Sequence, residues 1–395
     1  MAWTTFGLKV TTPLFNHDDT ATGLRVASIK GPMRYWFRAL AGTRFGDDVK
    51  GLARLEQAVF GSTERKCPVR LRLSAQPRDT YRGAAGTLPL SDDDGKWIAY
   101  LLGQGHVVYN RETKKFSNTR PYVKPGGTFT LKVGFSGDER ADALTMAGLW
   151  LACTYGGFGA RTRKGFGGVR LIHQDGPLPK VWQQHSADTP GIDHYRALGH
   201  LPVSDGALAE CAKNYLPEAN GRTGGTPRYP VLGEGATIAA LGEPSGGTWR
   251  EAAAEAGELY RHFRAPRPNR STEARYDPFI KTAEYEEVVH GDDTRFPLGA
   301  LGLPVVFKEG NVVNAYDGGE DLRRASPLWF RFVEDPERRE WRLFSFAFHS
   351  AFLPGGRGPE VRLQGGKQGR KTVTVTDADV RERTQAWMEA STSRD

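Results

Sequence analysis

The sequence predicts an α+β fold in two domains, each with an antiparallel sheet covered by helices. Length is the first observation behind this prediction, because 395 residues are about twice the usual size of a domain. Composition is the second, since 38% hydrophobic and 25% charged residues are typical of globular proteins. The third is that segments of period two alternate with segments of helical period along the first half of the chain.

A strand and a helix begin this alternation. A strand is predicted over residues 4–14, because apolar Phe6, Leu8 and Val10 alternate with the residues between them, which is typical of a strand with one buried face. A helix is predicted over 31–42, where Pro32 suits the first helical position and Gly42 suits the residue after the last. Its apolar residues recur at helical spacing and predict packing on the sheet: Met33, Trp36, Phe37 and Leu40. Trp36 is therefore expected in the core.

The same two periods predict the remaining elements of the first half. In chain order these are a helix at 51–60, strands at 69–73, 97–102 and 129–135, a helix at 138–155 and a strand at 169–172. An inserted loop or hairpin is expected at 103–126. The order strand, helix, strands, helix, strand is the ferredoxin-like split βαβ topology, which is also that of the RNA-recognition fold.

Several prolines between residues 174 and 206 predict a domain boundary there. We therefore expect a ferredoxin-like domain over 1–180 and a second one, with insertions, over 200–395. The second half is predicted to hold a helix at 249–263 and strands at 305–308, 329–334 and 341–352.

Charge and cysteine usage narrow the class of function. A net charge of +8 favours a polyanionic partner, and the three cysteines show no CxxC spacing that would predict a disulfide framework or a zinc site. No apolar run reaches the roughly 18 residues of a membrane span, and the N-terminus lacks the pattern of a signal peptide. We expect a cytoplasmic protein without membrane contact.

A glycine-rich basic loop at 155–168 is the clearest candidate site. Its glycines permit positive φ and a close approach of the backbone to a ligand, and they include Gly157, Gly159, Gly165 and Gly167. Its cations are Arg161, Arg163 and Lys164, and no acidic residue occurs from 143 to 174. We predict that the loop clamps RNA phosphates with its backbone and cations, while Phe158 and Phe166 stack on bases. The alternative is a flexible, solvated turn.

Two nucleotide-binding motifs do not fit this loop. A P-loop ends in Gly-Lys-Ser or Gly-Lys-Thr, whereas Lys164 precedes its glycine. A dinucleotide fingerprint lies between a strand and a helix, whereas Gly156 to Ala160 follow a predicted helix. No cofactor is therefore expected.

A second basic set lies on the predicted helix at 31–42 and just before it. Lys30, Arg34 and Arg38 occur in a stretch, residues 20–46, that has no Asp or Glu. Like charges one turn apart destabilise a helix unless an anion lies against them, so we predict anion binding here. The alternative is an ordinary solvated helix face.

A third set stays open between RNA, a partner subunit and plain surface. It comprises Arg261, His262, Arg264, Arg267 and Arg270, with Arg323 and Arg324 later in the chain. The tail at 365–371 is similarly ambiguous. Asp92, Asp93 and Asp94 are predicted to form a surface acidic run without a partner.

No set of residues predicts an active site. His17 stands beside Asp18 and Asp19, where it would serve as an acid or base in attack by an RNA 2′-hydroxyl, or the three would hold a metal; we predict a plain polar loop. His349 lies in an apolar strand and is expected to be a hydrogen-bonded core residue. There is no HExxH, HxHxD or GxSxG motif, so we expect no catalytic residue and no metal.

Six segments, in order along the chain, carry a resemblance to a known protein family: residues 12–15, 28–40, 56–62, 156–168, 303–307 and 323–328. Together they resemble the large capping RAMP subunit of the type III-B CRISPR (Cmr) effector complex. Two mild departures are Met33, where leucine is commoner, and Phe37, where a second tryptophan is frequent; both keep the apolar face.

The resemblance implies two ferredoxin-like domains and a place at the end of the RAMP backbone near the 3′ part of the guide RNA (crRNA). There the subunit is expected to contact guide or target RNA and neighbouring RAMP subunits, while a different subunit cuts the target. By motif position, Lys30, Arg34, Arg38, Arg161, Arg163 and Lys164 carry over as RNA-facing residues. The rival hypothesis is a metal-independent RAMP endoribonuclease that processes CRISPR RNA with His17.

Overall fold

The computed structural model describes most of the chain. The described residues are 2–16, 23–76, 80–81, 88–90, 92–203, 206–218, 225–265, 286–307, 310–353, 355, 359–365 and 369–393.

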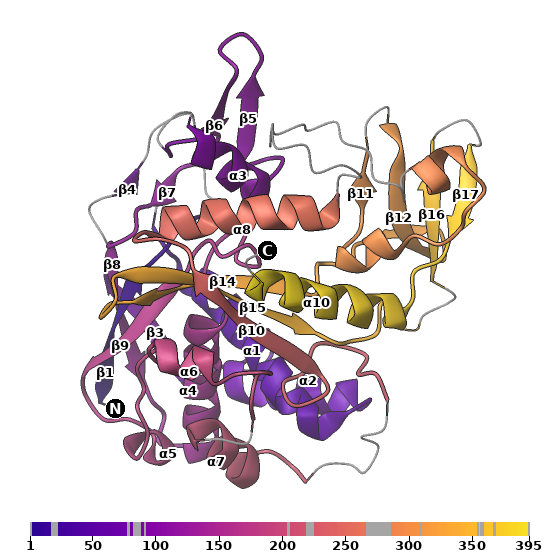
Figure 1. Cartoon of the computed structure of the whole chain (residues 1–395). Coiled ribbons are helices and arrows are strands. Elements are labelled where there is room, and N and C mark those ends of the chain that lie inside the picture. Colours follow the sequence, from indigo (N-terminus) through magenta and orange to yellow (C-terminus); the bar gives the residue numbers. More distant parts are fainter. Residues whose placement is uncertain are drawn as a thin grey trace.

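A four-stranded antiparallel sheet dominates the N-terminal half (Figure 1). Its strands are β1 (Trp3–Val10), β3 (Arg70–Ala75), β8 (Thr128–Gly134) and β9 (Val169–Asp175). Helices α1 (Val26–Phe45) and α4 (Glu139–Thr154) join them, with α2 (Val49–Phe60) after α1. The spatial order β3-β8-β1-β9 is that of a ferredoxin-like sheet, so the predicted topology is confirmed.

The alternating apolar residues bury the sheet against α1 and α4. Phe6, Leu8, Phe129 and Leu131 are fully buried in one cluster with residues of both helices. Trp36 is buried there too, as predicted. The opposite face of the sheet therefore presents the polar residues of the same strands.

Helix α1 is longer than predicted, and both of its predicted boundaries are wrong. Pro32 lies inside the helix. Gly31 precedes it, and the missing Cβ of glycine removes much of the clash that a proline imposes on the preceding residue. Gly42 is also internal; a Cβ there would meet the Tyr229 ring at 2.6 Å, so this glycine permits close packing. The helix ends at Gly46, whose φ is 51°.

The predicted strand at 97–102 is wrong, because these residues belong to helix α3 (Asp93–Leu102). Buried residues occur on most sides of α3, so its short apolar run shows no helical period. The missed signal was Asp92, whose side chain accepts a hydrogen bond from the Gly95 amide and caps the helix.

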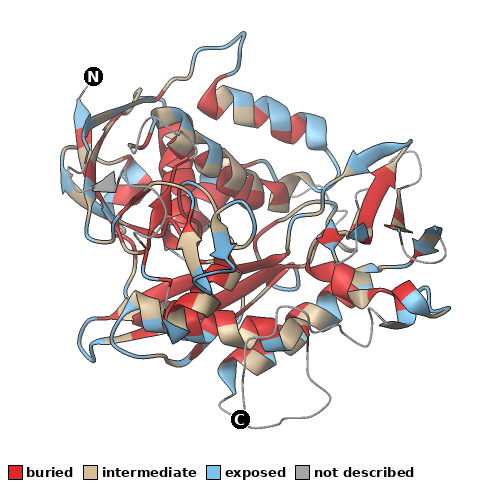
Figure 2. Ribbon diagram, turned by 90° about the horizontal axis from the view of Figure 1, so that it is seen from above, coloured by how far each residue is buried: buried red, intermediate tan, exposed pale blue. Residues whose placement is uncertain are grey.

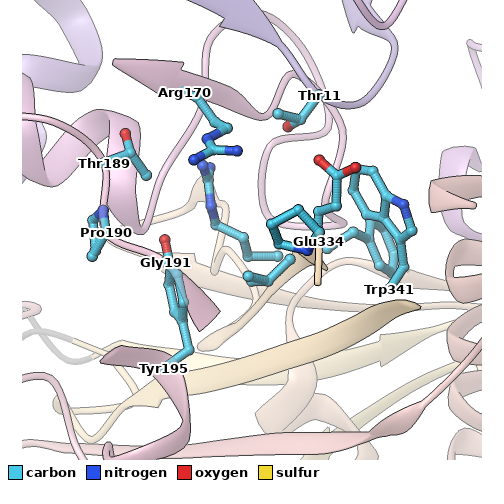
Figure 3. A pocket seen from close by; sticks show the side chains of 12 residues that line it. Thr11, Arg170, Thr189, Pro190, Gly191, Tyr195, Glu334 and Trp341 are labelled. Carbon is cyan, nitrogen blue, oxygen red and sulfur yellow. The ribbon is translucent and has the colours of Figure 1, made fainter. Parts of the chain in front are cut away.

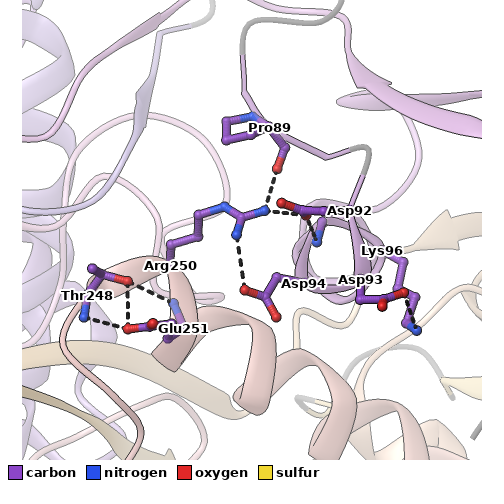
Figure 4. A network of polar contacts seen from close by, with 9 residues as sticks. Pro89, Asp92, Asp93, Asp94, Lys96, Thr248, Arg250 and Glu251 are labelled. Carbon is purple, nitrogen blue, oxygen red and sulfur yellow. Dashed lines mark hydrogen bonds and ion pairs between the residues drawn. The ribbon is translucent and has the colours of Figure 1, made fainter.

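The acidic run at 92–94 also has a partner, contrary to expectation. It comes from α8 (Trp249–Arg264), which packs beside α3 (Figure 4). The Arg250 guanidinium donates to the Asp94 carboxylate at 3.0 Å, to the Asp92 carboxylate and to the Pro89 carbonyl at 2.9 Å. This network joins a helix of the first half to one of the second.

Replacing Arg250 by alanine is expected to lower the free energy of unfolding by about 1 kcal/mol, because the ion pairs are partly exposed to solvent. Urea unfolding measures it. Lys96, which forms a single ion pair with the fully exposed Asp93 among the described residues, supplies a control whose loss should cost less. Equal effects of the two substitutions would contradict the conclusion that Arg250 stabilises the contact between α3 and α8.

The second half holds a three-stranded sheet in the order β10-β15-β14. Its elements are β10 (Thr237–Pro244), α8, β14 (Leu328–Asp335), β15 (Glu340–Phe348) and α10 (Asp377–Thr392). This is the ferredoxin-like order for the first three strands, and among the described residues no fourth strand joins it. The α+β class is confirmed, whereas the domain limits 1–180 and 200–395 stay a prediction.

The remaining elements are short. They are β2 (Leu14–Phe15), β4 (Thr80–Tyr81), β5 (Val107–Asn110), β6 (Lys115–Asn118), β7 (Tyr122–Val123), α5 (Lys180–Gln183), α6 (Ile192–Arg196), α7 (Gly206–Tyr215), η1 (Glu286–His290), η2 (Pro297–Leu301), β11 (Val305–Val306), β12 (Val312–Asp317), β13 (Glu320–Leu322), β16 (Glu360–Gln364) and β17 (Arg370–Val373). Strands β5 and β6 form the hairpin predicted within 103–126. Strands β11, β12, β13, β16 and β17 form a separate sheet.

The two halves share their cores, and buried residues concentrate in the central strands (Figure 2). One face of the three-stranded sheet packs on α1, where the rings of Trp36 and Trp329 lie 5.5 Å apart. The other face packs on α8 and α10, where Phe330 lies 5.2 Å from Tyr260 and 5.1 Å from Trp387. The glycine-rich loop, which follows α4, lies at this junction against β14.

Candidate nucleic-acid interface

The glycine-rich loop at 155–168 is bonded to itself and to the start of the chain. The Phe158 amide donates to the Gly167 carbonyl, the Ala160 amide to Phe15, and the Gly167 amide to Pro13, at 2.8–2.9 Å. The Gly168 amide donates to the Thr12 hydroxyl at 2.9 Å. Because these donors are occupied, the predicted backbone clamp for phosphates is wrong for this part of the loop.

The glycines serve the fold of the loop. Gly159, Gly165 and Gly167 have φ of 88°, 82° and 69°, as the prediction of positive φ requires. A Cβ would lie 2.0 Å from the Phe158 carbonyl oxygen at Gly167 and 2.3 Å from the Phe332 ring at Gly165, while at Gly157 it would meet the Gly167 carbonyl at 2.6 Å. The close approach that glycine permits here is to the protein itself.

The two loop phenylalanines are core residues, so the prediction that they stack on bases is wrong. Phe158 is 0% and Phe166 1% exposed. Phe166 packs edge-on against Phe15, with ring centroids 5.8 Å apart. The return of the chain onto residues 12–15 buries both rings.

Arg331 of β14 ties the loop to the second half, and sequence reasoning missed it. Its side chain is buried, and its guanidinium donates to the Gly156 carbonyl at 3.0 Å and to the Val169 carbonyl at 2.7 Å. These two residues stand at either end of the loop. The sequence offers no signal for this role, because Arg331 is simply a single charged residue within an apolar predicted strand.

A small cavity lies beside Arg331 (Figure 3). It is lined by Thr11, Arg170, Tyr195, Glu334 and Trp341, among others, and has a volume of about 60 Å³. Cofactor pockets are several times larger, so this cavity has room for a few waters and not for a nucleotide.

The three loop cations point to different surroundings. Arg161 is half-buried and donates to the Gln104 carbonyl at 2.7 Å. The Arg163 guanidinium lies over the Trp329 ring at 4.8 Å, and the Phe330 amide donates to the Arg163 carbonyl at 3.1 Å. The Lys164 ammonium nitrogen lies 3.7 Å from the centre of the Tyr260 ring.

Two members of the third basic set join these cations. Arg264 of α8 reaches the Tyr100 hydroxyl at 3.5 Å and lies over Tyr260 at 5.7 Å. Arg324 donates to the Ser350 hydroxyl at 3.3 Å and interacts electrostatically with Arg163. We call the whole group the basic–aromatic cluster: Arg161, Arg163, Lys164, Arg264 and Arg324, with Tyr35, Tyr100, Tyr260 and Trp329.

The cluster is electrostatically unbalanced. None of its five cations forms an ion pair with a described residue. Burial, reinforced by Arg264, Arg161 and Arg163, holds the pKa of Lys164 well below its usual value. Burial likewise lowers the pKa of Arg324 and of Arg161. Desolvated cations that form no ion pair are a setting in which an anionic ligand is strongly favoured.

Two residues of the basic set on α1 form ion pairs with a carboxylate of the protein itself. Glu56 of α2 accepts two bonds from Arg38, at 3.0 Å each, and lies 3.4 Å from Arg34. Arg34 also donates to the Phe60 carbonyl at 3.2 Å. Glu56 therefore offsets part of the charge that led us to predict anion binding on α1, and the RNA-facing role of this set stays a prediction. Lys30 forms no ion pair with a described residue.

Four further candidates are the residues His17, Arg267, Arg270 and His349. His17, Arg267 and Arg270 lie outside the described residues. His349 is bonded to the Thr384 hydroxyl at 3.0 Å, as expected, but it is only partly buried and follows the end of β15, so its predicted place in the core is wrong. Within the described ranges there is no group of three His, Cys, Asp or Glu placed to hold a metal, and none of the described helices is long and apolar enough to cross a membrane.

Comparisons with known proteins agree on one family. The RAMP superfamily matches residues 6–170. CRISPR system Cmr subunit Cmr1-1 of Pyrococcus furiosus is 28% identical over 339 residues, which cover 86% of this chain and 84% of that protein. Cmr subunit Cmr1-2 of the same organism is 36% identical over 177 residues, which cover 42% of this chain and 93% of that protein.

A solved structure shows the same fold. The crystal structure of Cmr1 from Pyrococcus furiosus in its apo form superposes with a TM-score of 0.57 at 23% identity, covering 97% of both chains. The likeness in sequence and the shared fold extend over most of the chain. The chain belongs to the RAMP superfamily, as a subunit of the Cmr type.

Proposed function

We propose that the protein is a non-catalytic RNA-binding subunit of a type III-B CRISPR effector complex. It caps the RAMP backbone near the 3′ end of the crRNA and helps to bind guide and target RNA, next to other RAMP subunits. The relatives support the complex, because both carry the name of Cmr subunits. The RNA-binding role is supported by the structure of the junction between the two halves.

The single observation that carries the proposal is the unbalanced charge of the basic–aromatic cluster. Five cations from three separate parts of the chain meet without an ion pair to any described residue. Bringing like charges together costs folding free energy, which a phosphate would recover. Arg163 and Arg161 stand half-exposed at its edge, so they are the groups that would reach a phosphodiester.

The α1 set has a smaller role in this proposal. Arg34 and Arg38 share one carboxylate, so together with Glu56 they retain a single net positive charge. Lys30 adds a second. They would contribute long-range attraction to RNA, which salt screens, more than direct phosphate contacts.

Changing Arg161, Arg163 and Arg324 together to glutamine is expected to weaken binding of single-stranded crRNA by at least about tenfold. Each lost phosphate contact reduces the slope of log affinity against log salt by about 0.7, so the loss of the Arg161 and Arg163 contacts lowers it by about 1.4. Fluorescence anisotropy over a salt series measures both quantities. The effect should be uniform across RNA sequences, because phosphate contacts carry no base information.

A matched control changes Lys180 and Lys213 to glutamine. These lysines lie on α5 and α7, at the opposite end of the molecule from α8 (Figure 1). The control should bind as the unchanged protein does. Equal affinity of the unchanged protein and the triple variant would rule out the cluster as the RNA site.

The rival endoribonuclease is tested separately. The purified protein is incubated with repeat RNA in EDTA, and the products are resolved on a denaturing gel. We expect no discrete cleavage. Cleavage that is lost in the His17→Ala variant would replace the binding-subunit proposal by the enzyme.

A further inference from the structure

The open face of the four-stranded sheet carries charges that the proposed site does not use. Helices α1 and α4 cover one face, and the other presents every second residue of β1, β3, β8 and β9. We call its basic residues the sheet-face cations: Lys9, Arg70, Arg72, Lys132 and Arg170. In Figure 1 this sheet lies along the left side of the molecule.

Strand register places these cations directly against one another. Arg72 of β3 pairs with Lys132 of β8, and Lys9 of β1 pairs with Arg170 of β9. Side chains of directly opposite residues start about 5 Å apart, and like charges there destabilise a sheet. Two such pairs on one face are an arrangement that folding alone does not favour.

Counter-charges on this face are few. None of the sheet-face cations forms an ion pair with a described residue. Asp175 stands opposite Thr5 at the edge of the sheet, and Glu334 shares the small cavity with Arg170. Within the part of the chain that the structure describes, no carboxylate lies within ion-pair distance of Lys9, Arg70, Arg72 or Lys132.

We propose that this face is a second binding surface, which takes the phosphodiester backbone of single-stranded RNA. Cations two residues apart on a strand repeat every ~7 Å, which offers a row of positive charge along an extended strand of RNA. Arg70 and Arg72 form such a row. The inference rests on the proposed RNA-binding function, but it uses none of the residues of the basic–aromatic cluster.

An exposed aromatic residue supports RNA over an acidic protein as the occupant. Trp3 is 38% exposed on the same face, and Gly134 lies between it and Arg70. A flat aromatic ring among cations suits base stacking beside phosphates. A protein partner would need an apolar centre, and here the large exposed apolar residues are only Trp3 and Ile172 among those described.

The test changes Lys9, Arg72 and Lys132 together to glutamine. Affinity for a long single-stranded RNA should fall about tenfold, and the salt slope should fall by about 2 because three phosphate contacts are lost. Folding should not suffer, since the change removes like charges; the denaturation midpoint checks this. Trp3→Ala should weaken binding while it leaves the salt slope unchanged, because stacking releases no counterions.

The variants already described separate the possible failures. If the cluster variant loses affinity but the sheet-face variant keeps both affinity and salt slope, this inference is overturned and the proposed function stands. If the unchanged protein fails to bind RNA, both fail together. If the sheet-face variant loses a co-purifying acidic subunit and keeps its RNA salt slope, the surface is a protein interface and the inference is likewise overturned.

Discussion

Replacing Arg331 by leucine is expected to lower the free energy of unfolding by about 3 kcal/mol, because two buried carbonyls lose their donor. The guanidinium is buried and donates to the carbonyls of Gly156 and Val169. Leaving each of them unsatisfied costs about 1–3 kcal/mol, and leucine gains back part of this through apolar packing. Guanidinium unfolding, followed by circular dichroism, measures the change.

Two further variants distinguish the effect of the paired N–H donors of the guanidinium from the effect of its positive charge. Arg331→Lys keeps the charge but not the planar pair of donors, so it should recover only part of the stability. Arg338 lies in the exposed turn between β14 and β15 and serves as the control. The Arg338→Leu variant should change the free energy of unfolding by no more than ~0.5 kcal/mol. A leucine variant as stable as the unchanged protein would mean that Arg331 does not hold the loop to the second half.

The sequence predicted the N-terminal sheet well because one face of each strand is buried. Phe6, Leu8, Phe129 and Leu131 alternate with polar residues, and that period depends on local geometry alone. The prediction failed at α3, where burial on most sides removed the period from the sequence. Only the cap at Asp92 marked a helix there.

The candidate site was located from sequence, but its chemistry was not. Glycines in a basic loop are equally consistent with a ligand-binding loop and with close packing against the protein itself. Which of the two applies is decided by Phe332 and residues 12–15, which lie far away in the chain. Glu56 accepts hydrogen bonds from Arg38, which lies 18 positions earlier in the chain. Arg331 donates to the carbonyls of Val169 and Gly156, which lie 162 and 175 positions earlier. No local pattern encodes such pairings.

Separation along the chain also explains why the sequence left the role of the third basic set undecided. Arg264 and Arg324 stood among the undecided basic residues, and the fold brings both to the glycine-rich loop. Their grouping around Tyr35 and Tyr260 is a property of the junction between the two halves. It follows from how the three-stranded sheet packs between α1 and α8.

Replacing Lys164 by methionine is expected to raise the free energy of unfolding at neutral pH. The Lys164 stem is partly exposed, but its nitrogen is buried and has no hydrogen-bond partner among the described residues. It faces Arg161 and Arg163 in its own loop, Tyr260 and Arg264 on α8, and Phe330 on β14. Methionine fills similar space without a charge to desolvate.

The sign of the pH dependence follows from the lowered pKa of Lys164. The unfolded chain binds this proton up to about pH 10.4, whereas the folded protein releases it at a lower pH. Between the two values unfolding takes up a proton, so the stability of the unchanged protein rises with pH by about 1.4 kcal/mol per unit. The advantage of Lys164→Met should therefore shrink as the pH is raised towards 10.

Guanidinium unfolding of both proteins at several pH values measures this difference directly. Lys213→Met, on an exposed face of α7, is the control and should show a difference that does not vary with pH. A Lys164→Met protein less stable than the unchanged one at neutral pH would mean that the amine is charged and held by a partner.

The same variant separates two roles of Lys164 in RNA binding. An amine that is buried, with its pKa held well below the usual value, is a poor ligand for a phosphate, whereas the Arg163 guanidinium is partly exposed at the edge of the cluster. Lys164→Met should therefore weaken RNA binding less than Arg163→Gln, even though both remove one basic side chain. An equal or larger loss with Lys164→Met would mean that the Lys164 ammonium leaves the aromatic site and contacts a phosphate.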